Sequence, residues 1–251
     1  MDEEVFEAAE TAAMNDVELQ KAETELAEEL ELAEDVADAI EAEELSDTAD
    51  IEIRQFEVGP LGTNCYAIVV NGGCMVIDPG DQGAEIAEAL SDVEVGAIVA
   101  THGHPDHVGG VAALKEKTGA PYFIHEADNE LAKHAGEPDW TGLVTHNAPE
   151  ADMFLHEGDV LQLGPVSIEV FETPGHTPGG VVLVGDGFAF VGDTLFPGSC
   201  GRSDLPGGDP HVLGESLQRL KEIIPPETEI FCGHGPSTTM KTELRRNPYL
   251  Q

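Results

Sequence analysis

From residue 51 onward, hydrophobic residues occur mostly in short runs, and these runs predict a series of β-strands with a few helices between them. Residues 51–58 and 65–70 are rich in β-branched side chains and are separated by the turn sequence GPLGTN. The apolar segment GAIVATH at 96–102 has the continuity of a buried strand. Further strands are expected at 74–80, 121–125, 160–164, 166–173, 181–186, 188–194 and 229–233, and helices at 84–90, 108–119, 126–136, 211–223 and 239–246.

The order of these elements indicates the fold class. Strands mixed with helices come first, strands then dominate, and helices return at the end. Helices and strands do not alternate regularly, so two sheets facing each other with helices outside fit better than a doubly wound sheet. Residues 136–153 are expected to form a long loop, in which Trp140 is either a cover for a pocket or a core residue.

The first fifty residues differ in kind from the rest. They contain twenty Asp or Glu, one Lys, and no Gly or Pro, and this Ala-, Glu- and Leu-rich composition favours helix. We therefore expect an acidic N-terminal segment over 1–50 and one domain over 51–251. The segment is interpreted either as a solvated tail with transient helix or as a helical arm that contacts a basic partner or a second copy.

The formal net charge of −39 restricts the partners of the chain. Nucleic acids and anionic membrane surfaces are polyanions and are disfavoured as partners. A small-molecule substrate is the expected partner. No apolar run approaches the roughly 18 residues of a membrane span, and the acidic N-terminus is unlike a secretory signal, so we expect a cytoplasmic protein. At about 1 M salt the Debye length falls to roughly 3 Å, so such a charge also suggests a salt-adapted host.

Metal-ligand side chains are concentrated in one short segment, VATHGHPDHVGG at 99–110. His102, His104, Asp106 and His107 fall within six positions, directly after an expected buried strand. Neutral imidazole and carboxylate are good ligands for divalent first-row metals. Neighbouring glycines and a proline let the backbone bend sharply, so these side chains could turn toward one point.

One segment cannot supply all the ligands of two metal ions. Three further candidate ligands occur in comparable places. His176 lies in TPGHTPGG, Asp193 in FVGDTLF and His234 in FCGHGPST, each after an expected strand and beside glycine. All three could therefore converge on one edge of the sandwich. The other histidines are interpreted as surface or structural residues: His125, His134, His146, His156 and His211.

The series HxHxDH, then His, Asp and His, resembles the metallo-β-lactamase superfamily over essentially all of residues 51–251. Within it, GDTLFPGSCGRSDLPGGD and HGPSTTMKTELRRNPYL look like the short glyoxalase II-like hydrolases. The superfamily implies an α/β fold, an αββα sandwich of two mixed sheets with helices on the outside and metals at the sheet edge.

The resemblance also implies two divalent metal ions, zinc as the first expectation and iron or manganese as alternatives that suit the same ligands. The implied ligands of one ion are His102, His104 and His176, those of the other are Asp106, His107 and His234, and Asp193 bridges them. Some true β-lactamases use cysteine at the position of Asp193, so an aspartate there points away from antibiotic hydrolysis.

Two such cations can lower the pKa of a shared water toward neutrality, and the resulting hydroxide would attack a carbonyl. Asp106 could orient this nucleophile or accept its proton, which makes it the candidate catalytic residue. A thiolate leaves readily because the pKa of a thiol is about 8.5, whereas an amine needs a proton donor, and no spare acid motif is evident. An acyl thioester is therefore the expected substrate, with a lactone or another activated ester as the alternative.

Substrate-binding residues are expected among the few cations near the implied site. Glyoxalase II uses a C-terminal helical domain to help hold glutathione, but only 17 residues follow His234, so glutathione is not implied here. Lys241, Arg245 and Arg246 could hold a substrate carboxylate or form salt bridges on the acidic surface. Arg202, in CGRSD, could bind substrate or hold the loop after Asp193.

Two other functions fit the same residues. Persulfide dioxygenases resemble this chain, and His102, His176 and Asp193 alone would make a two-histidine, one-carboxylate iron site. A non-catalytic role, with the acidic arm as a binding module, is disfavoured because all seven implied ligands are intact.

Overall fold

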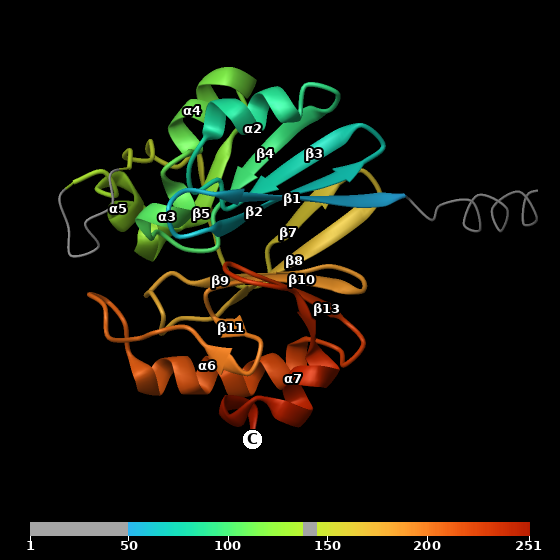
Figure 1. Ribbon diagram of the computed structural model, residues 1–251, viewed down its shortest axis with the longest axis vertical. Coiled ribbons are helices and arrows are strands. Elements are labelled where there is room, and N and C mark those ends of the chain that lie inside the picture. The colour runs from blue at the N-terminus through green and yellow to red at the C-terminus, as the bar shows by residue number, and fades with distance from the viewer. Residues whose placement is uncertain (1–49, 138–144) are drawn as a thin grey trace, which may run out of the picture. The chain divides into compact units, whose positions relative to one another are not determined.

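A computed structural model describes residues 50–137 and 145–251, shown as a ribbon in Figure 1. The predicted N-terminal segment, up to residue 49, lies outside the described residues. Trp140 lies outside them as well, so its predicted role stays a prediction.

The first half of the described chain forms a mixed six-stranded sheet in the order β1-β2-β3-β4-β5-β6. The first three strands pair antiparallel, and β3 through β6 pair parallel. Every residue of β2 is buried, which places this strand at the centre of the core. The strands are β1 (Ile51–Val58), β2 (Thr63–Val70), β3 (Gly73–Ile77), β4 (Glu94–Val99), β5 (Tyr122–His125) and β6 (Met153–Leu155).

The second half forms another mixed six-stranded sheet, in the order β14-β13-β10-β9-β8-β7. Only β10 and β13 pair parallel, and a small hairpin, β11 (Leu195–Phe196) with β12 (Ser199–Cys200), follows β10. The strands are β7 (Val160–Leu163), β8 (Val166–Glu172), β9 (Val181–Val184), β10 (Phe188–Gly192), β13 (Glu229–Cys232) and β14 (Thr238–Thr239).

Helices cover the outer face of each sheet. In Figure 1, α2, α4 and α5 lie outside the first sheet, and α6 and α7 lie outside the second. None of the helices in the described ranges has the length and apolarity that a membrane crossing requires. The helices are α2 (Gly83–Ala89), α3 (Pro105–Val108), α4 (Val111–Thr118), α5 (Glu126–Lys133), α6 (Pro210–Ile223), α7 (Met240–Arg246) and the 3₁₀ turn η1 (Pro248–Leu250).

Three apolar clusters fill the interfaces between the four layers. Leu114 of α4 packs with Val76 and Ile98 of the first sheet, and Leu217 of α6 packs against the outer face of the second. Between the sheets, side chains such as Ile68 and Leu183 form the central cluster. The predicted αββα sandwich of two mixed sheets is confirmed, because apolar faces of both sheets are buried against each other and against helices.

The predicted loop over 136–153 is wrong at its end, where β6 begins at Met153. This three-residue strand is too short to show an alternation of apolar and polar residues. It forms through parallel pairing with β5, in which Phe123 lies opposite Met153 and His125 opposite Leu155. The strand predicted at 96–102 also ends early, at Val99, and the freed residues form the turn that carries the first histidines.

Candidate metal centre

The seven ligand-type residues predicted from sequence meet at one edge of the sandwich, where strands of both sheets end. His102 follows β4, His104 directly precedes α3, and Asp106 and His107 lie on α3, which starts with Pro105. The second sheet supplies three more residues, each from a loop after a strand. His176 lies between β8 and β9, Asp193 follows β10, and His234 follows β13.

Three buried histidines form the first group. The ligand nitrogens of His102, His104 and His176 all lie within 4.8 Å of one another. The closest pair is His104 Nδ1 and His176 Nε2, which are 2.9 Å apart and come from different sheets. Burial lowers the pKa of His102 and His104, and neighbouring imidazoles lower it further, to about 3 for His104. These rings are therefore neutral, which is the form that binds metal.

A carboxylate and two histidines form the second group. The ligand atoms of Asp106, His107 and His234 lie within 4.8 Å of one another, and His234 Nε2 is 3.1 Å from Asp106 Oδ2. Burial would raise the pKa of Asp106, but the charge of His107 and the hydrogen bond from His234 hold it below its usual range. The carboxylate is thus ionised and available to a cation or a proton.

The carboxylate of Asp193 lies between the two groups. Its Oδ2 is 3.5 Å from His176 Nε2 and 3.6 Å from His234 Nε2, and its Oδ1 is 3.3 Å from His107 Nε2. Burial disfavours a charge on His107, yet Asp193 and two further carboxylates raise the pKa of this histidine well above its usual range. The site therefore attracts positive charge at the point where the groups meet.

Unpartnered buried atoms test whether the site fits divalent cations. Within the described ranges, His102 Nε2, His107 Nε2 and Asp193 Oδ1 are buried and make no hydrogen bond of good geometry, although the last two atoms lie 3.3 Å apart. A buried polar atom left unpaired costs about 1–3 kcal/mol, so three at one point need an explanation. Imidazole nitrogen and carboxylate oxygen are both ligands of divalent first-row metals, and the residues present fit such ions.

Asp78 supports the site and was missed by the sequence analysis. Its Oδ2 accepts hydrogen bonds from His107 Nδ1 (3.0 Å) and Thr101 Oγ1 (2.7 Å), and its Oδ1 accepts one from Thr101 N (2.7 Å). With Nδ1 held by Asp78, Nε2 is the ring nitrogen of His107 that faces the centre, where a bound cation would replace its proton. The available signal was the IDPG sequence, which places a carboxylate in the turn that ends a buried strand.

Backbone and hydroxyl groups orient two other side chains. His176 Nδ1 donates to the Arg202 carbonyl (2.6 Å), so Nε2 of His176 faces the site. Thr63 Oγ1 donates to Asp106 Oδ2 (3.0 Å) and adds a polar contact to the second group. The carbonyl of Arg202 thus holds a ligand-type residue, a role that no side-chain pattern could have indicated.

A cleft of about 450 Å³ opens over this cluster. Of the predicted substrate-binding residues, Arg202 lines it, and its guanidinium makes two hydrogen bonds to Asp204, of 2.7 and 2.9 Å. Lys241 and Arg245 are not among the lining residues, and Lys241 Nζ pairs with Glu227 at 2.8 Å. The lining residues are Leu61, His104, Asp106, His176, Asp193, Arg202, Leu205 and His234.

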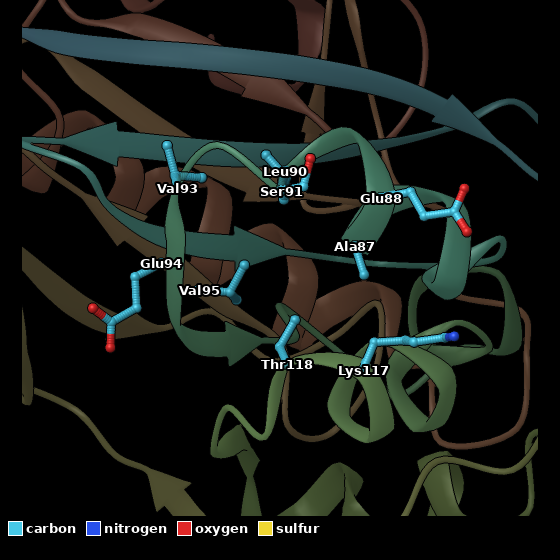
Figure 2. Close-up of a pocket in the computed structure, with 9 residues that line it drawn as sticks. All are labelled: Ala87, Glu88, Leu90, Ser91, Val93, Glu94, Val95, Lys117 and Thr118. Carbon is cyan, nitrogen blue, oxygen red and sulfur yellow. The ribbon is translucent and has the colours of Figure 1, made fainter.

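A second cleft, of about 420 Å³, lies between α2, α4 and the amino-terminal end of β4, whereas His102 follows the opposite end of that strand. In Figure 2 the carboxylates of Glu88 and Glu94 extend in opposite directions, and Lys117 points away from Glu94. This cleft offers no convergent ligands. In the described ranges, the groups able to hold a metal all lie in the histidine cluster or include Asp78 beside it.

The remaining histidines have structural or surface positions. His125 caps α5, where its Nδ1 accepts a hydrogen bond from Ala127 N (3.1 Å). The other four are exposed: His134, His146, His156 and His211. These positions agree with their interpretation as surface or structural residues.

Similar proteins were found among characterised and uncharacterised bacterial sequences. An uncharacterized protein of Aquifex aeolicus (strain VF5) is 39% identical over 205 residues, which cover 78% of this chain and 96% of that protein. The probable metallo-hydrolase YqgX of Bacillus subtilis (strain 168) is 33% identical, with 78% and 96% covered. The hydroxyacylglutathione hydrolase GloC of Haemophilus influenzae is 32% identical, with 70% and 86% covered.

Solved structures share the fold. The crystal structure of BLEG-1 B3 metallo-beta-lactamase has a TM-score of 0.75 and 32% identity, covering 80% of this chain and all of that one. TTHA1623 in a di-iron-bound form has a TM-score of 0.72 and 39% identity, covering 78% and 100%. ETHE1 from Myxococcus xanthus has a TM-score of 0.63 and 26% identity, covering 78% and 83%.

The family assignment follows from the site, the fold and these likenesses together. The model of the metallo-beta-lactamase superfamily matches residues 58–235, a range that contains both ligand groups. Proteins of this superfamily bind divalent metals, in agreement with the unpaired ligand atoms at the edge of the sandwich. This chain belongs to the metallo-β-lactamase superfamily.

Proposed function

We propose that this chain is a hydrolase that holds two divalent cations, zinc in the first instance, and cleaves acyl thioesters. The observation that carries the proposal is the position of the Asp193 carboxylate, whose oxygens lie within 3.6 Å of ring nitrogens from both groups. A shared carboxylate between two complete groups supports a pair of ions over a single ion. Two relatives named as a probable metallo-hydrolase and a hydroxyacylglutathione hydrolase support the reaction class.

Each ligand group would hold one of the two cations. We infer that the three-histidine group (His102, His104 and His176) holds one ion and that the second group (Asp106, His107 and His234) holds the other, with Asp193 shared. When bound, such ions would lower the pKa of a water and stabilise negative charge on a carbonyl oxygen.

The chain's own residues would orient the attacking water, accept its proton and determine which leaving group can depart. The ionised carboxylate of Asp106 can orient the attacking water and accept its proton. Among the described residues, the lining of the histidine cleft includes no lysine, tyrosine or cysteine, so a leaving amine would depend on the proton that Asp106 accepts from the water. A thiolate leaves without a proton because the pKa of a thiol is about 8.5, so this lining favours a thioester over an amide.

Metal analysis combined with a panel of acyl thioesters tests the proposal. We expect two divalent ions per purified chain, and hydrolysis that proceeds equally well without oxygen. The panel would include thioesters of glutathione and of simpler thiols, together with a lactone and an oxygen ester. A chain that binds two ions but cleaves none of the thioesters would contradict the thioesterase proposal.

A mononuclear iron enzyme that oxidises persulfides is the second candidate. The similarity to ETHE1 and to the di-iron form of TTHA1623 fits iron as well as zinc. His102, His176 and Asp193 would supply the two-histidine, one-carboxylate set that such an iron needs. One iron per chain, with oxygen consumed on glutathione persulfide, would favour this function over hydrolysis.

We propose that residues 1–50 are separate from the catalytic domain. Among the described residues, the candidate ligands and the residues lining the histidine cleft lie between positions 61 and 234. A chain shortened to residues 51–251 is therefore expected to keep the kcat and KM of the full chain, measured on the best thioester of the panel. A folded short chain with reduced turnover would instead assign the acidic segment a part in the reaction.

We propose that the chain is adapted to high salt. Residues 51–251 alone carry 30 acidic and 10 basic side chains, which repel one another at low ionic strength. Because the Debye length falls to about 3 Å at 1 M salt, the free energy of unfolding is expected to increase from low to molar KCl. Urea unfolding at several salt concentrations measures this, and a midpoint independent of KCl would contradict the proposal.

A further inference from the structure

Asp128, in the first turn of α5, has a fully buried carboxylate that the proposed reaction does not use. Its Oδ2 accepts a hydrogen bond from Gly103 N (2.8 Å), and its Oδ1 accepts one from Gly179 N (2.7 Å). Gly103 lies between His102 and His104, and Gly179 lies three residues after His176. One side chain therefore connects the two loops that carry the three-histidine group.

Both loops also lie directly against the backbone of α5. A Cβ atom at Gly103 would be 2.6 Å from the Asp128 carbonyl oxygen and 3.2 Å from Ala132 N. A Cβ atom at Gly179 would be 2.8 Å from Asp128 N and 2.9 Å from Asp128 Cβ. Neither glycine has a positive φ, so glycine is required here for close contact and not for backbone conformation.

The two loops come from different sheets, and their separation decides where the ligand nitrogens lie. His104 Nδ1 and His176 Nε2 are only 2.9 Å apart across this junction. One backbone bond, from Val181 N to the Thr101 carbonyl (2.9 Å), also joins the loops. The Asp128 carboxylate adds two charge-assisted hydrogen bonds, which are roughly twice as strong as neutral ones.

We propose that Asp128 is a positioning residue that holds the two loops at the separation required by the three-histidine group, and so sets the affinity of that group for its cation. This rests on the proposed metal centre. Groups that orient metal ligands through hydrogen bonds typically change metal affinity or activity by about 10–100-fold when they are replaced. Neither bonded N–H belongs to a residue of the second group: Asp106 and His107 lie further along on α3, and His234 lies in another loop, so the affinity of this group is expected to depend much less on the carboxylate.

The substitution Asp128→Asn tests this with little change in shape. An amide offers one acceptor oxygen, so one backbone N–H would face an NH₂ group instead of an oxygen. Titration of the metal-free full chain with Zn²⁺ alone, against a competing chelator, is expected to give one dissociation constant raised about 10–100-fold and the other changed much less. Circular dichroism would establish that the variant is folded.

Asp159→Asn is the matched control, because Asp159 Oδ2 also accepts a backbone N–H, from His156 (2.8 Å), in an exposed turn. We expect both dissociation constants of this control to equal those of the wild type. If Asp128→Asn fails to fold, Gly179→Ala replaces it, since the new Cβ would force this loop away from α5 while the carboxylate stays. The same selective loss of affinity is expected.

The outcomes separate this inference from the proposed function. A wild-type chain that binds fewer than two Zn²⁺ contradicts the binuclear centre and this inference with it. A wild-type chain with two ions, together with a folded variant whose two dissociation constants are unchanged, overturns the role of Asp128 alone.

Discussion

Replacing Asp193 with alanine is expected to lower kcat/KM for thioester hydrolysis by about 10³-fold, since metal ions and the charge they stabilise contribute several kcal/mol to such reactions. The Asp193 carboxylate contacts ring nitrogens of both ligand groups, so its loss affects both ions at once. Steady-state kinetics and the metal content of the purified variant measure the effect. We expect fewer than two ions to be retained.

Asp186→Ala is the control for this substitution. Asp186 is exposed in the turn before β10, at the opposite end of the strand that Asp193 follows. The control variant is expected to keep wild-type turnover and metal content. An Asp193→Ala enzyme as active as its control would show that the reaction does not depend on a shared carboxylate.

Replacing Glu243 with alanine is expected to lower the free energy of unfolding by about 1–3 kcal/mol, because a buried carboxylate that accepts three hydrogen bonds is removed. Glu243, on α7, is buried and accepts hydrogen bonds from Gly198 N (2.7 Å), Thr238 Oγ1 (2.7 Å) and Asn247 Nδ2 (3.0 Å). In the variant Gly198 N and Thr238 Oγ1 lose this acceptor, whereas Asn247 Nδ2 keeps its hydrogen bonds to the Phe196 and Ser199 carbonyls. Urea unfolding in saturating metal measures the change.

Glu227→Ala provides the comparison, because Glu227 is exposed and makes a surface ion pair with Lys241. Surface ion pairs contribute little to the free energy of unfolding, so the control variant should unfold at nearly the wild-type urea midpoint. The Glu243→Gln variant keeps one acceptor oxygen, so its urea midpoint should lie between those of Glu243→Ala and Glu227→Ala. Equal midpoints for the Glu243→Ala variant and its control would contradict a stabilising role of the buried carboxylate.

The convergence of the seven ligand-type residues could be predicted because they lie in four short glycine-containing segments that each follow a strand, which is a local signal. The supporting carboxylates could not be predicted in the same way. Asp78 contacts a histidine 29 positions away, and Asp128 contacts amides 25 and 51 positions away. In a chain with 50 acidic residues, composition does not separate a buried carboxylate from a solvated one.

The fold class followed from the order of strands and helices, whereas some boundaries did not. β6 forms only because β5 offers an unpaired parallel edge, and no periodicity within Met153–Leu155 indicates a strand. The end of β4 at Val99 depends on the turn that Thr101 and Asp78 stabilise. Local patterns therefore indicated the layers, and long-range pairing decided where individual strands begin and end.

The origin of His104 and His176 in different sheets has a consequence for the free energy of folding. The four cysteines are free, so no covalent cross-link joins the two halves of the described chain. A cation bound at this junction would act as a removable cross-link between them. At a thousandfold excess of free ion over the dissociation constant it would add about 4 kcal/mol of stability, and chelation would withdraw that amount reversibly.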